Sequence, residues 1–168
     1  MKWIKAYKDH KVDLVGDDIT KVRFFSVQML YEYGIMSTFL QGIKDKIMAT
    51  YKYTSSSNLL SFRVPFHIPK YRSIQGVSVS CLYRSSYSKD NDMCVLLAKI
   101  SNRSKGVTWI YNPVVYCKPR VDEDAVWLSY WPIGNILGAG DEVHVDIIVD
   151  KGLIVSECSA SLVMRMVE

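Results

Sequence analysis

The 168-residue sequence lacks the long apolar segments that are typical of membrane proteins and secreted precursors. No apolar run approaches the ~20 residues that a helix needs to cross a bilayer. The first residues, MKWIKAYKDHKVDL, contain charges throughout and lack the unbroken apolar block of a secretion signal. We therefore expect a cytosolic or nuclear protein with no membrane partner.

Closely spaced cysteines are also missing. The four cysteines, Cys81, Cys94, Cys117 and Cys158, stand far apart and form no CxxC pair, which argues against a zinc site. Cys81, Cys94 and Cys158 lie in apolar, strand-like runs, where cysteine behaves as a small hydrophobe. Because no secretory signal is evident, we expect no disulfides.

The sequence has no strong bias toward one sign of charge. Its net charge is +4, and Lys and Arg are scattered among Asp and Glu. Since no single-sign face of the kind that binds nucleic acid is evident, we expect no nucleic-acid partner.

Motifs for catalysis and phosphate binding are scarce. Serine is plentiful, but there is no GxSxG elbow, and neither Ser80 nor Ser129 sits at a strand-to-helix turn. The segment GAGD at 138–141 precedes a strand, whereas a phosphate cradle needs a following helix N-terminus. A Cys–His pair stays open, because such partners meet only in space. We expect no enzyme, no catalytic residue and no cofactor.

The sequence does contain regular alternation, most clearly in the segment EVHVDIIV at 142–149. Its apolar residues at 143, 145, 147 and 149 fall on one side of a strand, and Glu142, His144 and Asp146 fall on the other. A period of two predicts a sheet with one face in the core and the other in water.

Short strand-like segments continue through most of the chain, separated by turn-forming residues. The expected strands are Leu59–Val64, Val77–Arg84, Met93–Ile100, Thr108–Tyr111, Val114–Lys118, Val126–Trp131, Glu142–Val149, Leu153–Val155 and Ser159–Val167. No helical segments alternate with them, which argues against a parallel α/β sheet. The pattern predicts a mainly β protein, an antiparallel β-sandwich.

The N-terminal part of the sequence differs from the rest. A capping threonine and apolar residues at helical spacing predict a short helix: Thr20, Val22, Phe25, Met29 and Tyr33. Gly34 is placed to end it. We therefore expect residues 1–33 to form a helical linker segment and residues 34–168 to form the sandwich domain.

His144 and its flanking carboxylates are the first candidate for a metal site. Side chains on one face of a strand are ~7 Å apart, so one ion is not held by Glu142, His144 and Asp146 without further ligands. A solvated sheet face is the favoured interpretation, and we expect no metal.

The aromatic residues permit two interpretations. Trp109, Trp127 and Trp131 lie in expected strands, where wide side chains fill the gap of ~10 Å between two sheets. Exposed Trp and Tyr side chains would instead suit stacking on sugar rings, as in a carbohydrate-binding jelly roll. Their positions favour the core.

Several phrases, taken in order, resemble a known family. They are GIMSTFL (34–40), SFRVP (61–65), IQGVSVSCLY (74–83), VWLSYWPIGN (126–135), GDEVHVDI (140–147) and VSECSASLVM (155–164). In this order they resemble the C-terminal jelly-roll/Ig-like domain that follows the leucine-rich repeats of plant TIR–nucleotide-binding–leucine-rich-repeat disease-resistance proteins. The likeness covers about residues 34 to 168.

The resemblance implies a small non-catalytic sandwich that recognises a pathogen effector through its loops or packs on the repeats and nucleotide-binding region of the receptor. This sequence holds no TIR domain, P-loop or leucine-rich repeats, so the resemblance implies neither NAD cleavage nor nucleotide binding for this chain. The sequence also departs from the family pattern, with Gln41 where proline is expected and Tyr51 near the place of a Trp-Phe pair.

Partner contacts in a sandwich of this kind lie on the loops between strands. On that basis the candidate partner-binding residues are Tyr87, Lys89, Asp90, Arg103, Lys105, Lys118 and Arg120. The alternative is that these residues belong to solvated turns.

Overall fold

The protein, seen in a computed structural model, is mainly β. The structure describes the backbone of residues 5–7, 13–16, 31–36, 51–86, 94–111, 114–115, 121, 124–150 and 152–167, and the side chains of 51–86, 96–110, 121, 124–150 and 152–167. Among these residues there is no helix with the length and hydropathy needed to cross a membrane.

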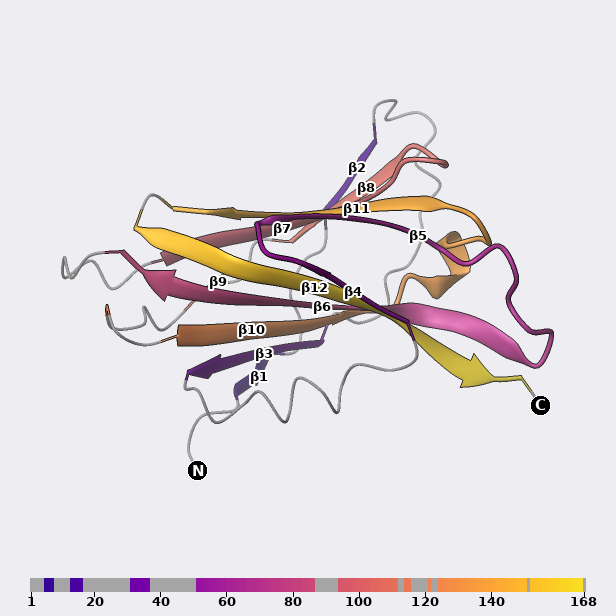
Figure 1. The fold of residues 1–168 in the computed structure, drawn as a ribbon, viewed down its shortest axis with the longest axis horizontal. Coiled ribbons are helices and arrows are strands. Elements are labelled where there is room, and N and C mark those ends of the chain that lie inside the picture. The colour runs from indigo at the N-terminus through magenta and orange to yellow at the C-terminus, as the bar shows by residue number, and fades with distance from the viewer. Residues whose placement is uncertain are drawn as a thin grey trace.

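The first of two antiparallel sheets, sheet A, has the strand order β1-β3-β10-β6-β12-β4 (Figure 1). Its strands are Lys5–Tyr7 (β1), Tyr31–Met36 (β3), Asp124–Trp131 (β10), Arg72–Ser85 (β6), Leu153–Met166 (β12) and Tyr51–Ser55 (β4). The two longest, β6 and β12, lie side by side and place Cys81 opposite Cys158, both buried and without a disulfide.

The second sheet, sheet B, has the order β2-β8-β7-β11-β5, with β9 paired to β7. Its strands are Asp13–Gly16 (β2), Val107–Tyr111 (β8), Cys94–Asn102 (β7), Glu142–Val149 (β11), Leu59–Arg63 (β5) and Val114–Val115 (β9). A single turn of 3-10 helix, η3 (Gly134–Ile136), follows β10 in the connection to β11.

The two sheets enclose one shared hydrophobic core, which gives a sandwich-like arrangement. Both sheets contribute buried side chains to it, among them Leu60, Phe62, Val77, Val79, Leu96, Ile100, Trp127, Val145 and Leu162. Trp109, Trp127 and Trp131 are at most 1% exposed, so the core interpretation is confirmed for these three and they are not open to a sugar ring. Trp3 lies outside the described residues.

Strand β11 shows the alternation that its sequence predicts. Val143, Val145 and Ile147 are buried in the core, and the polar residues between them are only partly covered on the outer face of sheet B. The bounds of this strand, Glu142–Val149, are those expected from the sequence.

Strand β10 departs from the expectation of one wet face. Val126 and Leu128, on the face opposite Trp127, are only 5% and 3% exposed, so both faces of this strand are buried. The expectation is wrong here because alternation determines which residues share a face, whereas burial depends on what covers that face. Apolar Val126 and Leu128 on the second face were the available signal.

The expected N-terminal helix is not supported. Tyr31–Met36 forms strand β3, paired with β1 on one side and β10 on the other, so the helix prediction is wrong for its last residues. Alternation in YEYGIM, with β-favouring aromatics, competes there with helical spacing, and sheet pairing prevails. Residues 17–30 lie outside the described residues, and positions 33 and 34, the expected domain boundary, both lie within β3.

Two further segments show where sequence patterns mislead. Strand β4 (Tyr51–Ser55) is not among the strands expected from the sequence. The expected pair Leu153–Val155 and Ser159–Val167 forms one strand, β12. The expected break coincides with a shift in the register against β6 between Val155 and Glu157, so a β-bulge, not a turn, explains the irregular pattern.

Candidate interaction site at one end of the two sheets

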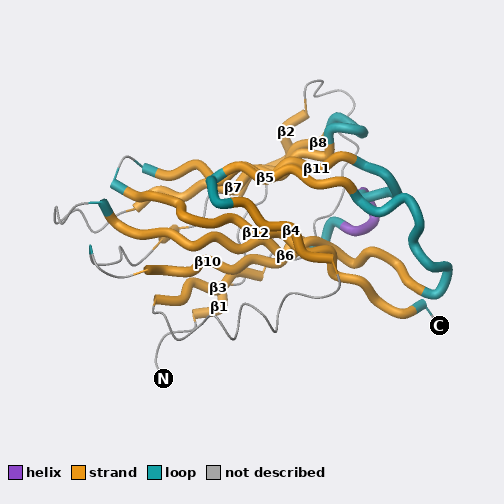
Figure 2. The backbone as a smooth tube through the Cα atoms, viewed as in Figure 1, coloured by secondary structure: helices purple, strands orange, loops and turns teal. Residues whose placement is uncertain are grey.

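Three connecting segments meet at one end of the molecule: residues 64–71, 103–106 and 132–141. Figure 2 shows these loops together at the end where β5 leads towards β6. The backbone joins them, because Val64 N–H donates to Asp141 O (2.8 Å), Gly140 N–H donates to Val64 O (3.0 Å) and Arg103 N–H donates to Glu142 O (2.9 Å). The end is therefore tied across both β5 and β7.

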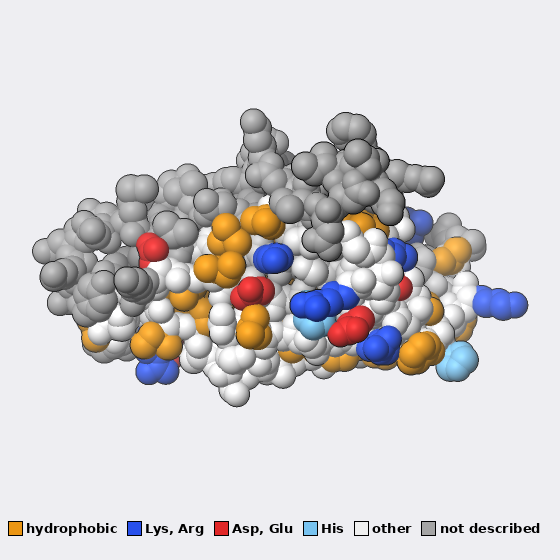
Figure 3. Space-filling view, turned by 90° about the horizontal axis from the view of Figure 1, so that it is seen from above, with side chains coloured by type: hydrophobic (Ala, Val, Ile, Leu, Met, Phe, Trp, Pro, Cys, Tyr) orange, Lys and Arg blue, Asp and Glu red, His pale blue; other side chains and the backbone are white. Residues whose placement is uncertain are grey.

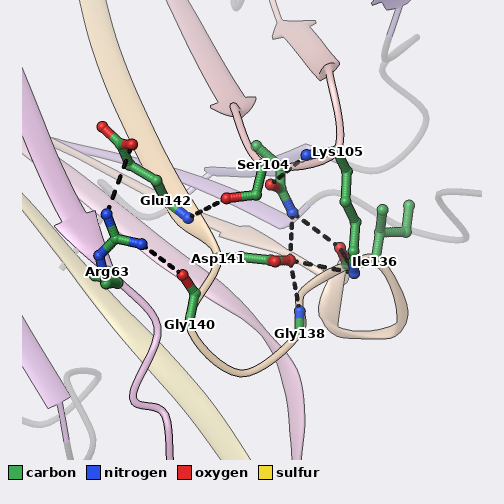
Figure 4. Close-up of polar contacts among 9 residues, drawn as sticks. Arg63, Ser104, Lys105, Ile136, Gly138, Gly140, Asp141 and Glu142 are labelled. Atoms are coloured by element: carbon green, nitrogen blue, oxygen red, sulfur yellow. Dashed lines mark hydrogen bonds and ion pairs between the residues drawn. The ribbon is translucent and has the colours of Figure 1, made fainter.

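A buried carboxylate holds this end together. Asp141 Oδ2 accepts hydrogen bonds from the Asn102 side-chain amide (2.8 Å) and from Gly138 N–H (2.8 Å), and lies 3.1 Å from Lys105 Nζ (Figure 4). The Asn102 amide and Lys105 Nζ also donate to Ile136 O, at 3.1 and 2.9 Å. We call these five residues the Asp141 junction.

The charge of Asp141 is stabilised despite its burial. Burial raises the pKa of Asp141, but the hydrogen bonds from Gly138 and Asn102, together with the hydrogen bond and charge of Lys105, outweigh it, so the pKa lies below its ordinary value. Asp141 is 8% exposed, and a buried carboxylate requires such partners. The junction is a structural support that keeps the loops in register.

A second polar group lies on the outer face of sheet B. Ser61 Oγ is 3.1 Å from His144 Nδ1, and His144 Nε2 is 2.7 Å from Glu142 Oε1. The hydrogen bond from His144 is the main cause that lowers the pKa of Glu142, and the nearby charges of His144, Arg63 and Arg103 lower it further. Register explains the contact, because β5 places Ser61 directly opposite His144.

The order Ser61–His144–Glu142 matches that of a catalytic triad, but its setting does not support catalysis. The Glu142 side chain is 42% exposed and Ser61 is exposed, so water surrounds the row. Strand β11 is paired on both sides, so its backbone N–H groups serve the sheet and form no oxyanion hole. Among the described residues, no group of three or more His, Cys, Asp or Glu side chains is placed to hold a metal.

A set of aromatic and basic residues covers the outside of this end. It comprises Arg63, Phe66, His67, Lys70, Tyr71 and Arg72, which we call the end surface; all are exposed except Arg72, which is partly buried. Phe66 is 67% exposed and Tyr71 is 54% exposed, high values for such large rings. The Arg63 guanidinium carbon lies 5.9 Å from the Phe66 ring centroid, and that of Arg72 lies 5.7 Å from the Tyr71 centroid. Both distances suit a cation–π contact.

The neighbourhood of the end surface is also apolar and basic. Met166 (64% exposed) ends β12 beside it, and Val167 (46% exposed), the next residue, donates its N–H to Tyr71 O (2.8 Å). On the outer face of sheet B, Figure 3 shows Lys, Arg and His side chains together with hydrophobic side chains and with Asp or Glu side chains among them. Exposed hydrophobic side chains grouped in this way are typical of interaction surfaces.

Two of the sequence-predicted contact residues lie at this end. Arg103 is exposed in the β7–β8 turn, and the Lys105 ammonium is directed into the Asp141 junction while its side chain stays 42% exposed. The remaining candidates, Tyr87, Lys89, Asp90, Lys118 and Arg120, lie outside the described residues.

The residues of the end surface are not among the contact residues predicted from the sequence. The segment VPFHIPKYR at 64–72 contained a usable signal: two prolines four residues apart, each next to or near an aromatic and a basic residue. Prolines restrict the backbone, and a short proline-bounded loop is too small to bury every ring that it contains. No protein-family model matches the sequence, and no curated protein matches it.

Proposed function

We propose that the chain is a non-catalytic recognition module, the jelly-roll/Ig-like domain that follows the repeats of a plant TIR–nucleotide-binding–leucine-rich-repeat immune receptor. The observation that carries this proposal is an exposed aromatic and basic surface held on a rigid end of two packed sheets. Binding residues placed on loops above a rigid scaffold are the usual arrangement of recognition domains.

The order of the sequence phrases supports the same proposal. The phrase SFRVP leads into the end surface, VWLSYWPIGN leads into the loop that holds Gly138, and GDEVHVDI begins with Gly140 and Asp141 at the end of that loop. Three of the six phrases that carry the resemblance thus contribute to this end. In this role the domain acts in the cytosol or nucleus, its partner is a pathogen effector protein, and its second contact is the repeat region of the receptor.

A transcript test decides whether the chain belongs to such a receptor. Long-read sequencing of transcripts that contain this reading frame is expected to show leucine-rich repeats encoded in frame and upstream of Met1. An upstream in-frame stop codon in every transcript, with no repeats before it, contradicts the receptor assignment.

A binding test addresses recognition itself. The purified chain, immobilised for interferometry, is exposed to a panel of purified secreted effectors from plant pathogens and, in parallel, to a glycan array. Saturable binding of an effector with no glycan bound is the expected result. Glycan binding with no effector bound contradicts the proposal and favours the carbohydrate-binding alternative.

A further inference from the structure

The end surface presents two rings, each with an arginine over it. Phe66 and Tyr71 are more than half exposed, and the guanidinium groups of Arg63 and Arg72 lie within 6 Å of their ring centroids. Tyrosine and arginine are over-represented among residues that dominate the binding energy of protein interfaces. Both pairs come from residues 63–72, the segment that runs from the end of β5 to the start of β6.

The side chains of the first pair are held against Gly140, and the backbone that carries the second pair is fixed by a turn. Arg63 Nη1 donates to Gly140 O (2.9 Å), and the Phe66 ring lies so close to Gly140 that a Cβ there would be 2.6 Å from a ring carbon. The turn before β6 is closed by Arg72 N–H donating to Pro69 O (2.9 Å). Side chains that are already ordered lose less entropy when a partner binds.

The charge of this end is one-sided, because its carboxylates already have partners. Asp141 is buried in the junction with Lys105, and Glu142 contacts His144 and lies 3.8 Å from Arg63. Besides Lys105, which is paired with Asp141, the described Lys and Arg side chains at this end are Arg63, Lys70, Arg72, Arg103 and Arg165. Such a surface attracts a partner with an excess of carboxylates.

We propose that the end surface binds a protein whose docking face carries Asp and Glu side chains around an apolar pocket that receives Phe66 and Tyr71. This inference rests on the proposed recognition function and specifies the chemistry of its partner. Protein carboxylates pair with Arg72 and the other basic side chains of this end, while Arg63 stays with Gly140 and Glu142 and the rings fill the pocket.

An anionic membrane is the competing occupant, and the geometry argues against it. Because each arginine lies over the ring itself, a ring inserted among acyl chains would take a guanidinium to the same depth. Placing that charge in hydrocarbon is unfavourable, whereas a protein partner supplies carboxylates at the same depth as its apolar pocket.

The test uses the whole chain and a phage-displayed library of random 16-residue peptides. Enriched peptides are expected to combine several Asp or Glu residues with a large apolar residue. Synthetic copies of them are expected to bind roughly tenfold or more weakly to the double variant Phe66→Ser/Tyr71→Ser. Raising the salt concentration is expected to weaken binding further, because exposed charges are screened.

Matched variants keep the test specific. Ile154→Ser also removes an exposed apolar side chain, 49% exposed and paired in register with Arg84 on β6, and is expected to leave binding unchanged. Arg72→Gln is expected to weaken binding, while Arg84→Gln, which removes an arginine paired with Asp124 (3.6 Å), is not. Unchanged thermal midpoints show that the variants are folded.

Three results of the peptide experiment overturn the inference: no peptide enriched over a bait-free control, enriched peptides without acidic residues, or equal binding by Phe66→Ser/Tyr71→Ser. A membrane partner replaces the proposed protein partner if the wild-type chain co-sediments with phosphatidylserine vesicles, the double variant does not, and no acidic peptide is enriched. If an effector still binds Phe66→Ser/Tyr71→Ser, the end surface is not the binding site, but the proposed recognition function is retained. If the transcripts encode no repeats, the receptor assignment is wrong, but the peptide result is unaffected.

Discussion

Asp141 and Glu142 are consecutive carboxylates with opposite surroundings. Asp141, the last residue of the loop before β11, points inward and accepts hydrogen bonds at the junction, whereas Glu142 begins the strand and points to the outer face of sheet B (Figure 4). Asp141 is 8% exposed, while the Glu142 side chain is 42% exposed. The same chemical group therefore stabilises the fold at position 141 and lies exposed on the surface at position 142.

This difference separates two roles at one end of the molecule. The Asp141 junction fixes the loops from inside, and the end surface lies outside it. The two are linked by the backbone hydrogen bonds of Val64 with Asp141 and Gly140 and by the hydrogen bond from Arg63 to Gly140. Loss of the Asp141 carboxylate, or of the loop conformation that carries it, should lower stability, whereas changes at the end surface should lower binding.

The largest effect is expected from Gly134→Ala, which disturbs the loop that carries Asp141. A Cβ at Gly134 would be 2.1 Å from Ile74 O, and a backbone atom within β6 has little room to shift. We expect a loss of roughly 3 kcal/mol in the free energy of unfolding, measured by urea denaturation. Gly138→Ala, whose Cβ would meet only flexible side-chain atoms of Lys105 and Asp141 at 3.3 Å and beyond, is the control and should be nearly neutral.

Asp141→Ala should come next. It removes one acceptor and leaves Asn102, Gly138 N–H and Lys105 without their shared partner, so we expect a loss of about 2 kcal/mol. Glu142→Ala, one residue on, should leave the urea midpoint unchanged within error. Equal midpoints for the two variants would contradict the different roles assigned to Asp141 and Glu142.

Lys105→Met tests how much the ion pair contributes to the stability of the junction. Its ammonium contacts Asp141 Oδ2 and Ile136 O, but the side chain is 42% exposed, so solvent screens the ion pair. We expect a loss of only about 0.5 kcal/mol in the same denaturation experiment. A loss as large as that of Asp141→Ala would show that the ion pair, and not the hydrogen bonds from Asn102 and Gly138, holds the loop.

Acid should reduce the difference between the wild type and Asp141→Ala. The native pKa of Asp141 is lowered, so its contribution is present above the unfolded value of about 3.9 and is lost as the pH falls through the native pKa. In that range the unfolded state binds more protons, and wild-type stability falls with falling pH. In denaturation at pH 6 and at successively lower pH, the free energies of unfolding of the wild type and Asp141→Ala should converge. A difference that stays constant with pH would contradict this prediction.

The strands of sheet B were largely predictable because their pattern is local. Strand β11 exposes one face, so alternation of Val143, Val145 and Ile147 with polar residues identifies it directly. Strand β3 was mistaken for helix, since its short YEYGIM pattern follows residues at helical spacing and its pairing with β10 joins residues about ninety positions apart. Sheet pairing of that range has no local signature.

The contacts of the junction were not predictable for a related reason, and the sequence signals the end surface only through its proline-bounded loop. Asn102 and Asp141 are 39 residues apart, so their contact arises only when β7 and β11 pair. Phe66 and Tyr71 read as ordinary hydrophobic residues, and only the position of their loop beyond the core leaves them exposed. Lys105 was correctly placed in a turn, but its contact with Asp141 depends on a loop distant in sequence.

Amide hydrogen exchange at Gly138 tests the division between the two carboxylates most directly. This N–H donates to Asp141 Oδ2, so exchange followed by NMR should be at least roughly tenfold faster in Asp141→Ala than in the wild type, and unchanged in Glu142→Ala. The same exchange rate in the wild type and in Asp141→Ala would show that the buried carboxylate does not fix this end of the protein.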